Sequence, residues 1–184
     1  MAMPQFPNRI ELTAYMLPQV PVGEPAPRLL DACTQFVDTF TARVAQERGY
    51  SLTVCDLTPR EEGPVVANLD ERLPWDDGWF RGIISSDTLE HIEEPANALR
   101  EFARVTEPGG FLILHIPVTI RGNGEFQANS YRPKGNPCHG HVWALGTDVL
   151  DMAVASGYKH VATFQSWDDY RCRVGVMWLL ERQR

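Results

Sequence analysis

Short apolar segments alternate along most of this chain with segments that have only one apolar face. Apolar runs of this length, rich in Val, Ile, Leu and Phe, are typical of buried β-strands. We predict seven strands, at residues 28–32, 51–56, 64–69, 82–85, 110–117, 158–165 and 173–182.

Helices are predicted where apolar residues recur every three or four positions. Val37, Phe40 and Val44 mark one face of a helix that ends at Gly49, because residues at this spacing share a helix face. A helix that starts at Pro95 fits as well, since the missing N–H of proline would be unpaired in a first turn anyway. The remaining helices are predicted at residues 9–17 and 147–156.

This order of elements predicts a single α/β domain over residues 1–184. Short buried strands joined by helices favour a mostly parallel sheet with helices on both faces. The shorter connection between the last two predicted strands permits one antiparallel edge strand. Residues 1–27 are predicted to form a lead-in helix and a Pro-rich connector, and residues 118–146 a long insertion rich in Gly, Asn and Pro.

Composition narrows the classes of partner. Of the 184 residues, 43% are hydrophobic and 22% charged, which suits a soluble domain with a sizeable core. The formal net charge of −7 argues against nucleic acid, because phosphate binding needs a basic face. No apolar run approaches the ~20 residues of a membrane helix, and the N-terminus lacks the features of a secretion signal. We therefore expect a cytoplasmic protein that binds neither nucleic acid nor membrane.

The cysteines do not indicate a disulfide framework or a metal site. The chain has four, at Cys33, Cys55, Cys138 and Cys172. None has a CxxC spacing, so reduced thiols are expected. Cys138, His139 and His141 form a CHGH sequence, but a fourth ligand is not apparent. We predict no bound metal.

The most specific pattern lies in residues 80–117. It consists of an apolar strand, then Leu89-Glu90-His91, Glu94-Pro95, Arg104-Val105 and Pro108-Gly109-Gly110, then a second apolar strand. In order and spacing this segment closely resembles the class I S-adenosylmethionine-dependent methyltransferases with a type 11/12-like domain. The resemblance implies a Rossmann-like fold, with a seven-stranded sheet, and S-adenosylmethionine as cofactor.

The resemblance and the geometry of parallel sheets place a cofactor at the same edge. Ligands of open α/β sheets bind beyond the carboxyl ends of the strands, where Asp31, Asp56, Asn68 and Ser85-Ser86 are predicted. Asp56 matches the family's acidic residue that accepts hydrogen bonds from the ribose hydroxyls, a task that suits two carboxylate oxygens. The resemblance implies a cofactor-binding set of Asp31, Cys33, Asp56, Leu57, Asn68, Leu69 and Ser85.

The glycine loop of the family is missing. After its first strand the family has Asp/Glu-x-Gly-x-Gly-x-Gly, whereas here Asp31 is followed by ACTQFV at residues 32–37. Those glycines permit positive φ and let the backbone approach the ligand closely. Gln35 and Phe36 would place bulk near the methionine end of the cofactor. We therefore expect the binding of S-adenosylmethionine to be weak or lost.

Two functions are consistent with these residues. The first is an S-adenosylmethionine-dependent methyltransferase acting on a small-molecule or sugar-like acceptor, with His91 as candidate general base. Tyr131, His141 and Trp143 are candidate substrate-pocket residues, with ordinary packing as the alternative. The second is a catalytically inactive pseudoenzyme that binds or scaffolds a protein partner, because fold does not imply function. Homo- and hetero-oligomers both remain open.

Residues 118–146 generate the first testable prediction. A long segment of this composition after the fifth predicted strand is typical of a mobile lid over a pocket. Hydrogen–deuterium exchange should be fast throughout the segment, because such lids have few lasting backbone hydrogen bonds. Protection equal to that of the central strands would contradict a lid.

Overall fold

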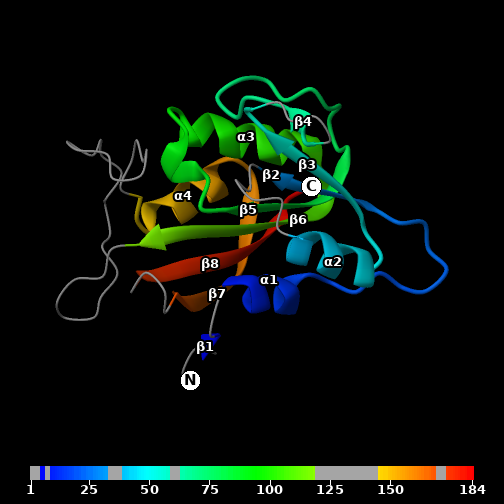
Figure 1. Cartoon of the computed structure of the whole chain (residues 1–184). Helices are drawn as coiled ribbons and strands as arrows, with labels where there is room; N and C mark the ends of the chain where they lie inside the picture. The colour runs from blue at the N-terminus through cyan, green and yellow to red at the C-terminus, as the bar shows by residue number, and fades with distance from the viewer. Residues whose placement is uncertain (1–4, 7–8, 33–38, 59–62, 119–144, 169–172) are drawn as a thin grey trace.

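The structure is a computed structural model that describes most of the chain (Figure 1). The described ranges are residues 5–6, 9–32, 39–58, 63–118, 145–168 and 173–184. The predicted lid at 118–146 and the loop at 33–37 therefore lie largely or wholly outside them. Within the described ranges, no helix is long and apolar enough to cross a membrane.

Eight strands form one sheet in the order β1-β7-β8-β6-β5-β2-β3-β4. Only β8 runs antiparallel to its neighbours, β6 and β7, and the pairings on both sides of this trio are parallel. The strands are β1 (Gln5–Phe6), β2 (Arg28–Ala32), β3 (Ser51–Asp56), β4 (Val65–Val66), β5 (Phe80–Ser86), β6 (Thr106–Val118), β7 (Tyr158–Asp168) and β8 (Arg173–Arg182).

The predicted fold class, a Rossmann-like and mostly parallel sheet, is confirmed. The antiparallel strand is β8, and it lies between β6 and β7 rather than at the edge of the sheet. The two-residue β1 adds an eighth strand outside β7. Three strands agree with their predicted ranges, namely β2, β3 and β8.

The strand β6 differs from its prediction at its start. It begins at Thr106 and contains Pro108-Gly109-Gly110, which were expected to form a turn before the strand. The register explains the difference, because Phe80 pairs with Thr106 but Gly82 pairs with Phe111. The extra residues of β6 bulge out of the ladder, and Gly109 takes a φ of 78° there, a conformation that glycine adopts without steric cost.

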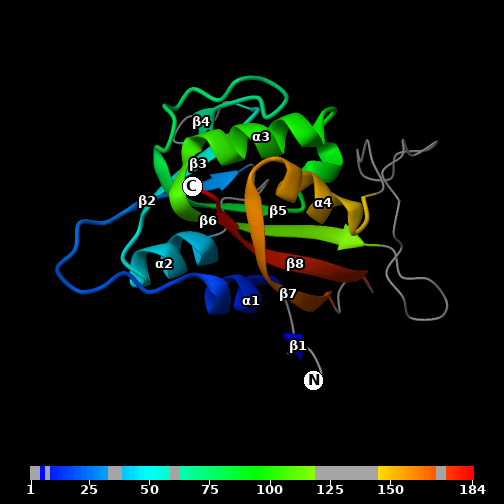
Figure 2. The same cartoon turned by 180° about the vertical axis from the view of Figure 1, so that it is seen from behind.

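Helices cover both faces of the sheet, as predicted (Figures 1 and 2). Helices α3 and α4 lie on one face, together with the short η1, and α1 and α2 lie on the other. Their bounds are α1 (Arg9–Met16), α2 (Thr39–Glu47), η1 (Leu89–His91), α3 (Pro95–Val105) and α4 (Asp148–Ala155).

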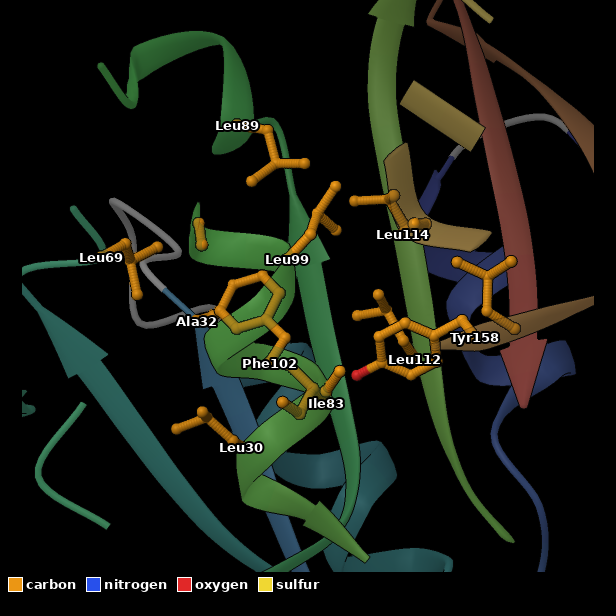
Figure 3. Close-up of a cluster of buried hydrophobic side chains, with 14 of the residues drawn as sticks. Leu30, Ala32, Leu69, Ile83, Leu89, Leu99, Phe102, Leu112, Leu114 and Tyr158 are labelled. Atoms are coloured by element: carbon orange, nitrogen blue, oxygen red, sulfur yellow. The ribbon is translucent and has the colours of Figure 1, made fainter. Parts of the chain in front are cut away.

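The larger core cluster lies under α3 and α4 (Figure 3). Leu99 and Phe102 of α3 are fully buried there with Ile83 of β5 and Leu112 of β6. Each such side chain contributes about 1.5–3 kcal/mol by leaving water. The hydroxyl of the buried Tyr158 lies 3.1 Å from Oγ1 of Thr106, so the polar end of this ring is satisfied inside the core.

The second core cluster lies under α1 and α2. Leu12 and Met16 of α1 are buried with Val44 of α2 and Met177 of β8. The predicted lead-in helix is therefore part of the core, because its apolar side covers the sheet. Phe111 of β6 belongs to the same cluster.

The close approach of Phe111 to Gly82 gives a prediction about stability. A Cβ built at Gly82 would lie 2.2 Å from Cζ of Phe111, far inside van der Waals contact. The substitution Gly82→Ala should therefore lower the free energy of unfolding by about 1–3 kcal/mol, the usual effect of overpacking a core. Urea unfolding measures it.

A double-mutant cycle tests the cause of that loss. Phe111→Leu shortens the side chain that would clash, so it should cost less in the Gly82→Ala background than in the wild type. Strictly additive effects would show that the ring does not set the requirement for glycine.

Candidate functional site

The candidate site lies at the carboxyl ends of the parallel strands. Chain order reverses between β2 and β5, because β3 and β4 lie on one side of this pair and β6 on the other. Ligands of open α/β sheets bind beside such a reversal. Asp31 is in β2, one residue before its end, and Asp56 ends the adjacent β3. The structure therefore brings these two predicted cofactor residues to neighbouring strand ends.

Asp56 is held by its own loop. Its Oδ1 accepts a hydrogen bond of 3.1 Å from the backbone N–H of Thr58, and its carbonyl accepts one of 3.0 Å from Ala67. The carboxylate is partly exposed, so it can also reach a ligand. The side chain of Leu57, next in the chain, is 62% exposed. Both positions suit a ligand beyond the end of β3, and their roles stay predictions.

Asn68 and Leu69 have different environments. Oδ1 of Asn68 accepts from the N–H of Asp70 at 3.1 Å, and its Nδ2 donates to Glu71 at 3.0 Å. The amide thus shapes a turn while remaining partly exposed. The side chain of Leu69 is 2% exposed and packs in the core (Figure 3). Its predicted contact with an adenine would have to come from its backbone.

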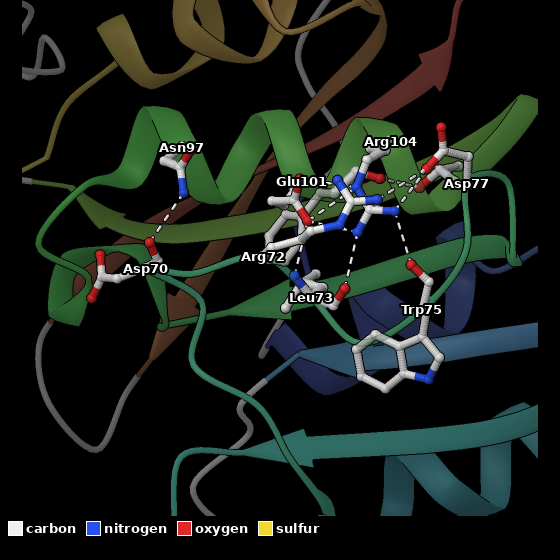
Figure 4. Close-up of polar contacts among 10 residues, drawn as sticks. Asp70, Arg72, Leu73, Trp75, Asp77, Asn97, Glu101 and Arg104 are labelled. Atoms are coloured by element: carbon white, nitrogen blue, oxygen red, sulfur yellow. Dashed lines mark hydrogen bonds and ion pairs between the residues drawn. The ribbon is translucent and has the colours of Figure 1, made fainter.

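A guanidinium clamps the segment that follows (Figure 4). Arg104 of α3 donates to the carbonyls of Trp75 at 2.8 Å and Leu73 at 3.0 Å. It also pairs with Glu101 at 2.7 Å and with Asp77 at 2.8 Å. Glu101 in turn accepts from the N–H of Leu73 at 2.9 Å. Residues 73–77 have no regular structure of their own, so this network is what attaches them to α3.

Asp70 makes a second attachment between the same segment and α3 (Figure 4). Its Oδ1 accepts from the N–H of Glu94 at 2.8 Å, and its carbonyl accepts from Nδ2 of Asn97 at 3.1 Å. Glu94 is the N-cap residue of α3, where N–H groups lack partners within the helix. The acid in NLDERLPW therefore satisfies a helix start.

The two serines at the end of β5 lie on opposite faces. Ser85 is fully buried on the face opposite to Ile84, which belongs to the second core cluster, and its role as a cofactor-binding residue stays a prediction. Ser86 is partly exposed and pairs with His115 of β6. Two residues after Ser86, Thr88 directs its hydroxyl hydrogen toward the carbonyls of Ala32 at 3.1 Å and Ser86 at 3.0 Å. This loop is thereby held against the end of β2.

Sequence reasoning missed one pair in this region. Asp87 and His115 were not among the predicted site residues, yet Oδ1 of Asp87 lies 2.9 Å from Nδ1 of His115. The signal that could have found them is a histidine inside the apolar run FLILHIP and an acid directly after β5. Their meeting depends on the pairing of β5 with β6, which the sequence alone does not reveal.

The other predicted side chains are only partly placed. His91 ends η1 and is half-buried, and its role as a base stays a prediction. Cys33 and the pocket candidates Tyr131, His141 and Trp143 lie outside the described residues. Within the described ranges there is no group of three or more His, Cys, Asp or Glu side chains that could hold a metal. Because Cys138, His139 and His141 lie outside those ranges, the absence of a metal also stays a prediction.

Comparison with known families identifies the segment that carries this site. A family model described as a methyltransferase domain matches residues 30–114. This match supports the assignment of the segment to the class I S-adenosylmethionine-dependent methyltransferases. The resemblance drawn from residues 80–117 is thereby confirmed.

Curated relatives and solved structures agree with this family. A demethylmenaquinone methyltransferase of Mycolicibacterium gilvum is 45% identical over 111 residues, which are 59% of this chain and 45% of the relative. The chain spans less than half of the length of this relative and of a second demethylmenaquinone methyltransferase, from Chlorobaculum tepidum.

Two solved structures share the methyltransferase fold. An S-adenosylmethionine-dependent methyltransferase from Mesorhizobium loti has a TM-score of 0.67 at 18% identity, covering 94% of this chain and 96% of that one. The 1,6-didemethyltoxoflavin-N1-methyltransferase of Burkholderia thailandensis, with bound substrate and S-adenosylhomocysteine, has a TM-score of 0.68 at 15% identity and covers 86% of this chain and 72% of that one. At these identities the likeness concerns the fold.

The Arg104 clamp generates a pH-dependent prediction. The guanidinium bonds Glu101 and so holds the pKa of that carboxyl below its ordinary value of 4.5. A lowered pKa adds stability that is fully present above the ordinary value and is lost as the pH falls through the lowered one. Arg104→Gln should lower the free energy of unfolding at about pH 7 by roughly 3 kcal/mol, the low end for a buried pair because both groups are partly exposed.

Unfolding measured over a range of pH distinguishes loss of the Arg104–Glu101 ion pair from a general loss of stability. The difference between wild type and Arg104→Gln should shrink as the pH falls below 4.5 and through the lowered pKa of Glu101, because the carboxyl then becomes protonated in both proteins. Arg100→Gln, on the exposed side of α3, is the matched control and should stay within about 0.5 kcal/mol of wild type. A difference that does not change with pH would exclude the ion pair as its source.

Proposed function

We propose that this protein is an S-adenosylmethionine-dependent methyltransferase that acts on a small-molecule acceptor. The observation that carries the proposal is the family segment itself, residues 30–114, with Asp31 and Asp56 at neighbouring strand ends beside the reversal of chain order. That is the position where the fold supports a nucleotide-like ligand.

The nucleoside half of the cofactor fits the residues present. Asp56 has a partly exposed carboxylate at the end of β3, and two acceptor oxygens suit the two ribose hydroxyls. Asn68, Leu57 and the backbone of Leu69 border the same strand end and would flank the adenine. Side-chain hydrogen bonds hold both the Asp56 loop and the Asn68 turn. Ligand binding should therefore cost little further conformational entropy there.

We expect the residues around the methionine half of the cofactor to weaken the affinity for S-adenosylmethionine. Asp31 is kept near the end of β2, but Cys33, Gln35 and Val37 stand where the family has its three glycines. Backbone approach is what glycine provides, and a side chain does not replace it. We propose that the cofactor binds mainly through its adenosine end.

The acceptor is proposed from the chemistry of the relatives. Several are named demethylmenaquinone methyltransferases, so a reduced naphthoquinone is the first acceptor to test, and a sugar-like acceptor is the second. S-adenosylmethionine supplies an electrophilic methyl group when bound, and the protein's task is to align an acceptor atom with it, which alone can account for much of the acceleration. A protein partner or an oligomer would be compatible with this role.

The alternative of a catalytically inactive scaffolding protein rests on one observation, the glycine-poor loop at residues 32–37. The curated relatives named above are methyltransferases and lend it no support. Cofactor binding separates the two functions most directly.

Isothermal titration with S-adenosylmethionine is the test. We expect binding with a dissociation constant weaker than ~1 μM, corresponding to less than roughly 8 kcal/mol. Asp56→Ala should weaken it at least about tenfold by removing the ribose acceptor. Asp151→Ala, on the exposed side of α4, is the matched control and should leave the affinity unchanged.

A gain-of-binding variant tests the loop. Replacing Cys33 and Gln35 by glycine together should strengthen binding, because both changes open the backbone to the ligand. Binding well below ~1 μM in the wild type would show that the loop does not weaken the site. No binding by either protein, and no methyl transfer to any acceptor, would instead favour the scaffolding function.

A further inference from the structure

A histidine interrupts the apolar strand β6 near its carboxyl end. His115 is 5% exposed, and the residues beside it, Leu114 and Ile116, belong to the larger core cluster. A buried imidazole needs polar neighbours. Oδ1 of Asp87 lies 2.9 Å from its Nδ1, and Oγ of Ser86 lies 3.4 Å from the same nitrogen.

The backbone links the same two residues a second time. The N–H of Asp87 donates to the carbonyl of His115 at 3.2 Å. Asp87 is the one non-glycine residue with positive φ, at 51°, in the described part of the chain. Such conformations are uncommon for residues with a side chain and gather at functional sites. The turn after β5 is therefore bent in a way that presents the carboxylate to the imidazole.

The contact favours one tautomer of the neutral imidazole. A carboxylate oxygen 2.9 Å from Nδ1 is favourable only when that nitrogen carries a hydrogen. The lone pair of the neutral ring then lies on Nε2, which is the nitrogen that accepts a proton. This ion-pair contact does not have the angles of a hydrogen bond, and catalytic hydrogen bonds often align only once substrate is bound.

The pair lies on the same side of the sheet as a predicted cofactor residue. Ile84 of β5 pairs with both Asp31 and Ile113, so the three side chains share a face. Ser86 and His115 are two positions farther along and point to that face as well. His115 is thus one strand away from the β2–β5 reversal, toward the end where a ligand would lie.

We propose that His115 is the general base of the methyl transfer, with Asp87 as the residue that orients it. This inference rests on the proposed function. The acceptor is a small molecule with an ionisable O–H, N–H or activated C–H group. The sequence assigned the same role to His91, and the experiment below therefore compares the two histidines.

The step balances as follows. The electron pair of the acceptor atom forms a bond to the methyl carbon of S-adenosylmethionine, and the carbon–sulfur bond breaks with its electron pair going to sulfur. The products are the methylated acceptor and S-adenosylhomocysteine. The proton of the acceptor passes to Nε2 of His115, and the resulting imidazolium is stabilised by the carboxylate of Asp87, because charged partners bond more strongly.

The pH dependence of the step is set by the groups that surround the His115 ring, and those of the described residues are as follows. On the face of His115, the titratable side chains from β2 and from the turn after β5 are Asp31 and Asp87. From β8, the residue paired with His115 is Met177, and from α1 the hydroxyl of Thr13 bonds its sulfur at 3.9 Å. A base here should give kcat one rising limb with pH, set by the imidazole, which levels off once the ring is neutral.

The experiment compares His115→Gln with His91→Gln and His160→Gln. Tritiated S-adenosylmethionine and a reduced naphthoquinone with a short prenyl chain are the probes. We expect His115→Gln to lower kcat by about 10²–10⁴-fold, the usual contribution of a general base, and to lose the imidazole limb of the pH profile. His160, on the exposed side of β7, is the control that should keep both.

Two further measurements separate catalysis from structure. Titration calorimetry should give His115→Gln an affinity for S-adenosylmethionine within about twofold of wild type, because a base adds little to ground-state binding. Asp87→Asn, a smaller change that should fold if His115→Gln does not, should lower kcat at least about tenfold by misorienting the ring.

A readout without turnover comes from NMR of the histidine ring nitrogens. In the wild-type protein His115 should show the Nδ1–H tautomer at neutral pH, and in Asp87→Asn that preference should weaken. An Nε2–H tautomer in the wild type would overturn the assignment. Normal turnover by His115→Gln with an unchanged pH profile would overturn the role of His115 alone, whereas a wild type that neither binds the cofactor nor transfers methyl would remove the proposed function and this role with it.

Discussion

The pairing of β5 with β2 is the constraint on which the rest of this structure depends. These strands are far apart in the chain, and β3 and β4 lie between them in sequence but on only one side of β2 in the sheet. Because β2, β3, β5 and β6 run parallel, their carboxyl ends all open at one edge. The same pairing sends α1 and α2 to one face and α3 and α4 to the other. A site at that edge follows from the topology before any side chain is considered.

Order in the segment between β4 and β5 comes from α3. β4 pairs with β3 over only two residues, too few to hold a long connection. Arg104 attaches this segment where strand pairing does not, because one planar guanidinium with five donors can bond two carbonyls and two carboxylates together. Asp70 adds a second attachment at the start of the helix. The segment proposed to flank the adenine is thus positioned by a helix that belongs to the most recognisable part of the sequence.

The sequence predicts those parts of the fold that local pattern determines. The ranges of β2 and β3 follow from apolar residues in short runs, and α3 from its apolar face and Pro95. β4 is shorter than predicted because its two valines are largely exposed, so hydrophobicity there does not reflect burial. The sequence does not reveal which of the two neighbouring serines is buried; the strand register places them on opposite faces, where Ser85 is buried and Ser86 partly exposed. The contact between Asp87 and His115 was not predicted for the same reason, because a contact between strands depends on their register and not on spacing along the chain.

The Asp87–His115 pair also bears on the choice between an active and an inactive protein. A positive φ at a non-glycine residue costs on the order of 1 kcal/mol, and an imidazole in an apolar strand carries a desolvation penalty that its contacts only partly offset. A scaffold needs neither, because a leucine at the position of His115 would pack against Met177 without a polar partner. The glycine-poor sequence at residues 32–37 is proposed to weaken one half of the cofactor site, but it is far along the chain from the turn after β5. Holding a carboxylate against a buried imidazole at the ligand edge is therefore more readily explained by proton transfer than by packing.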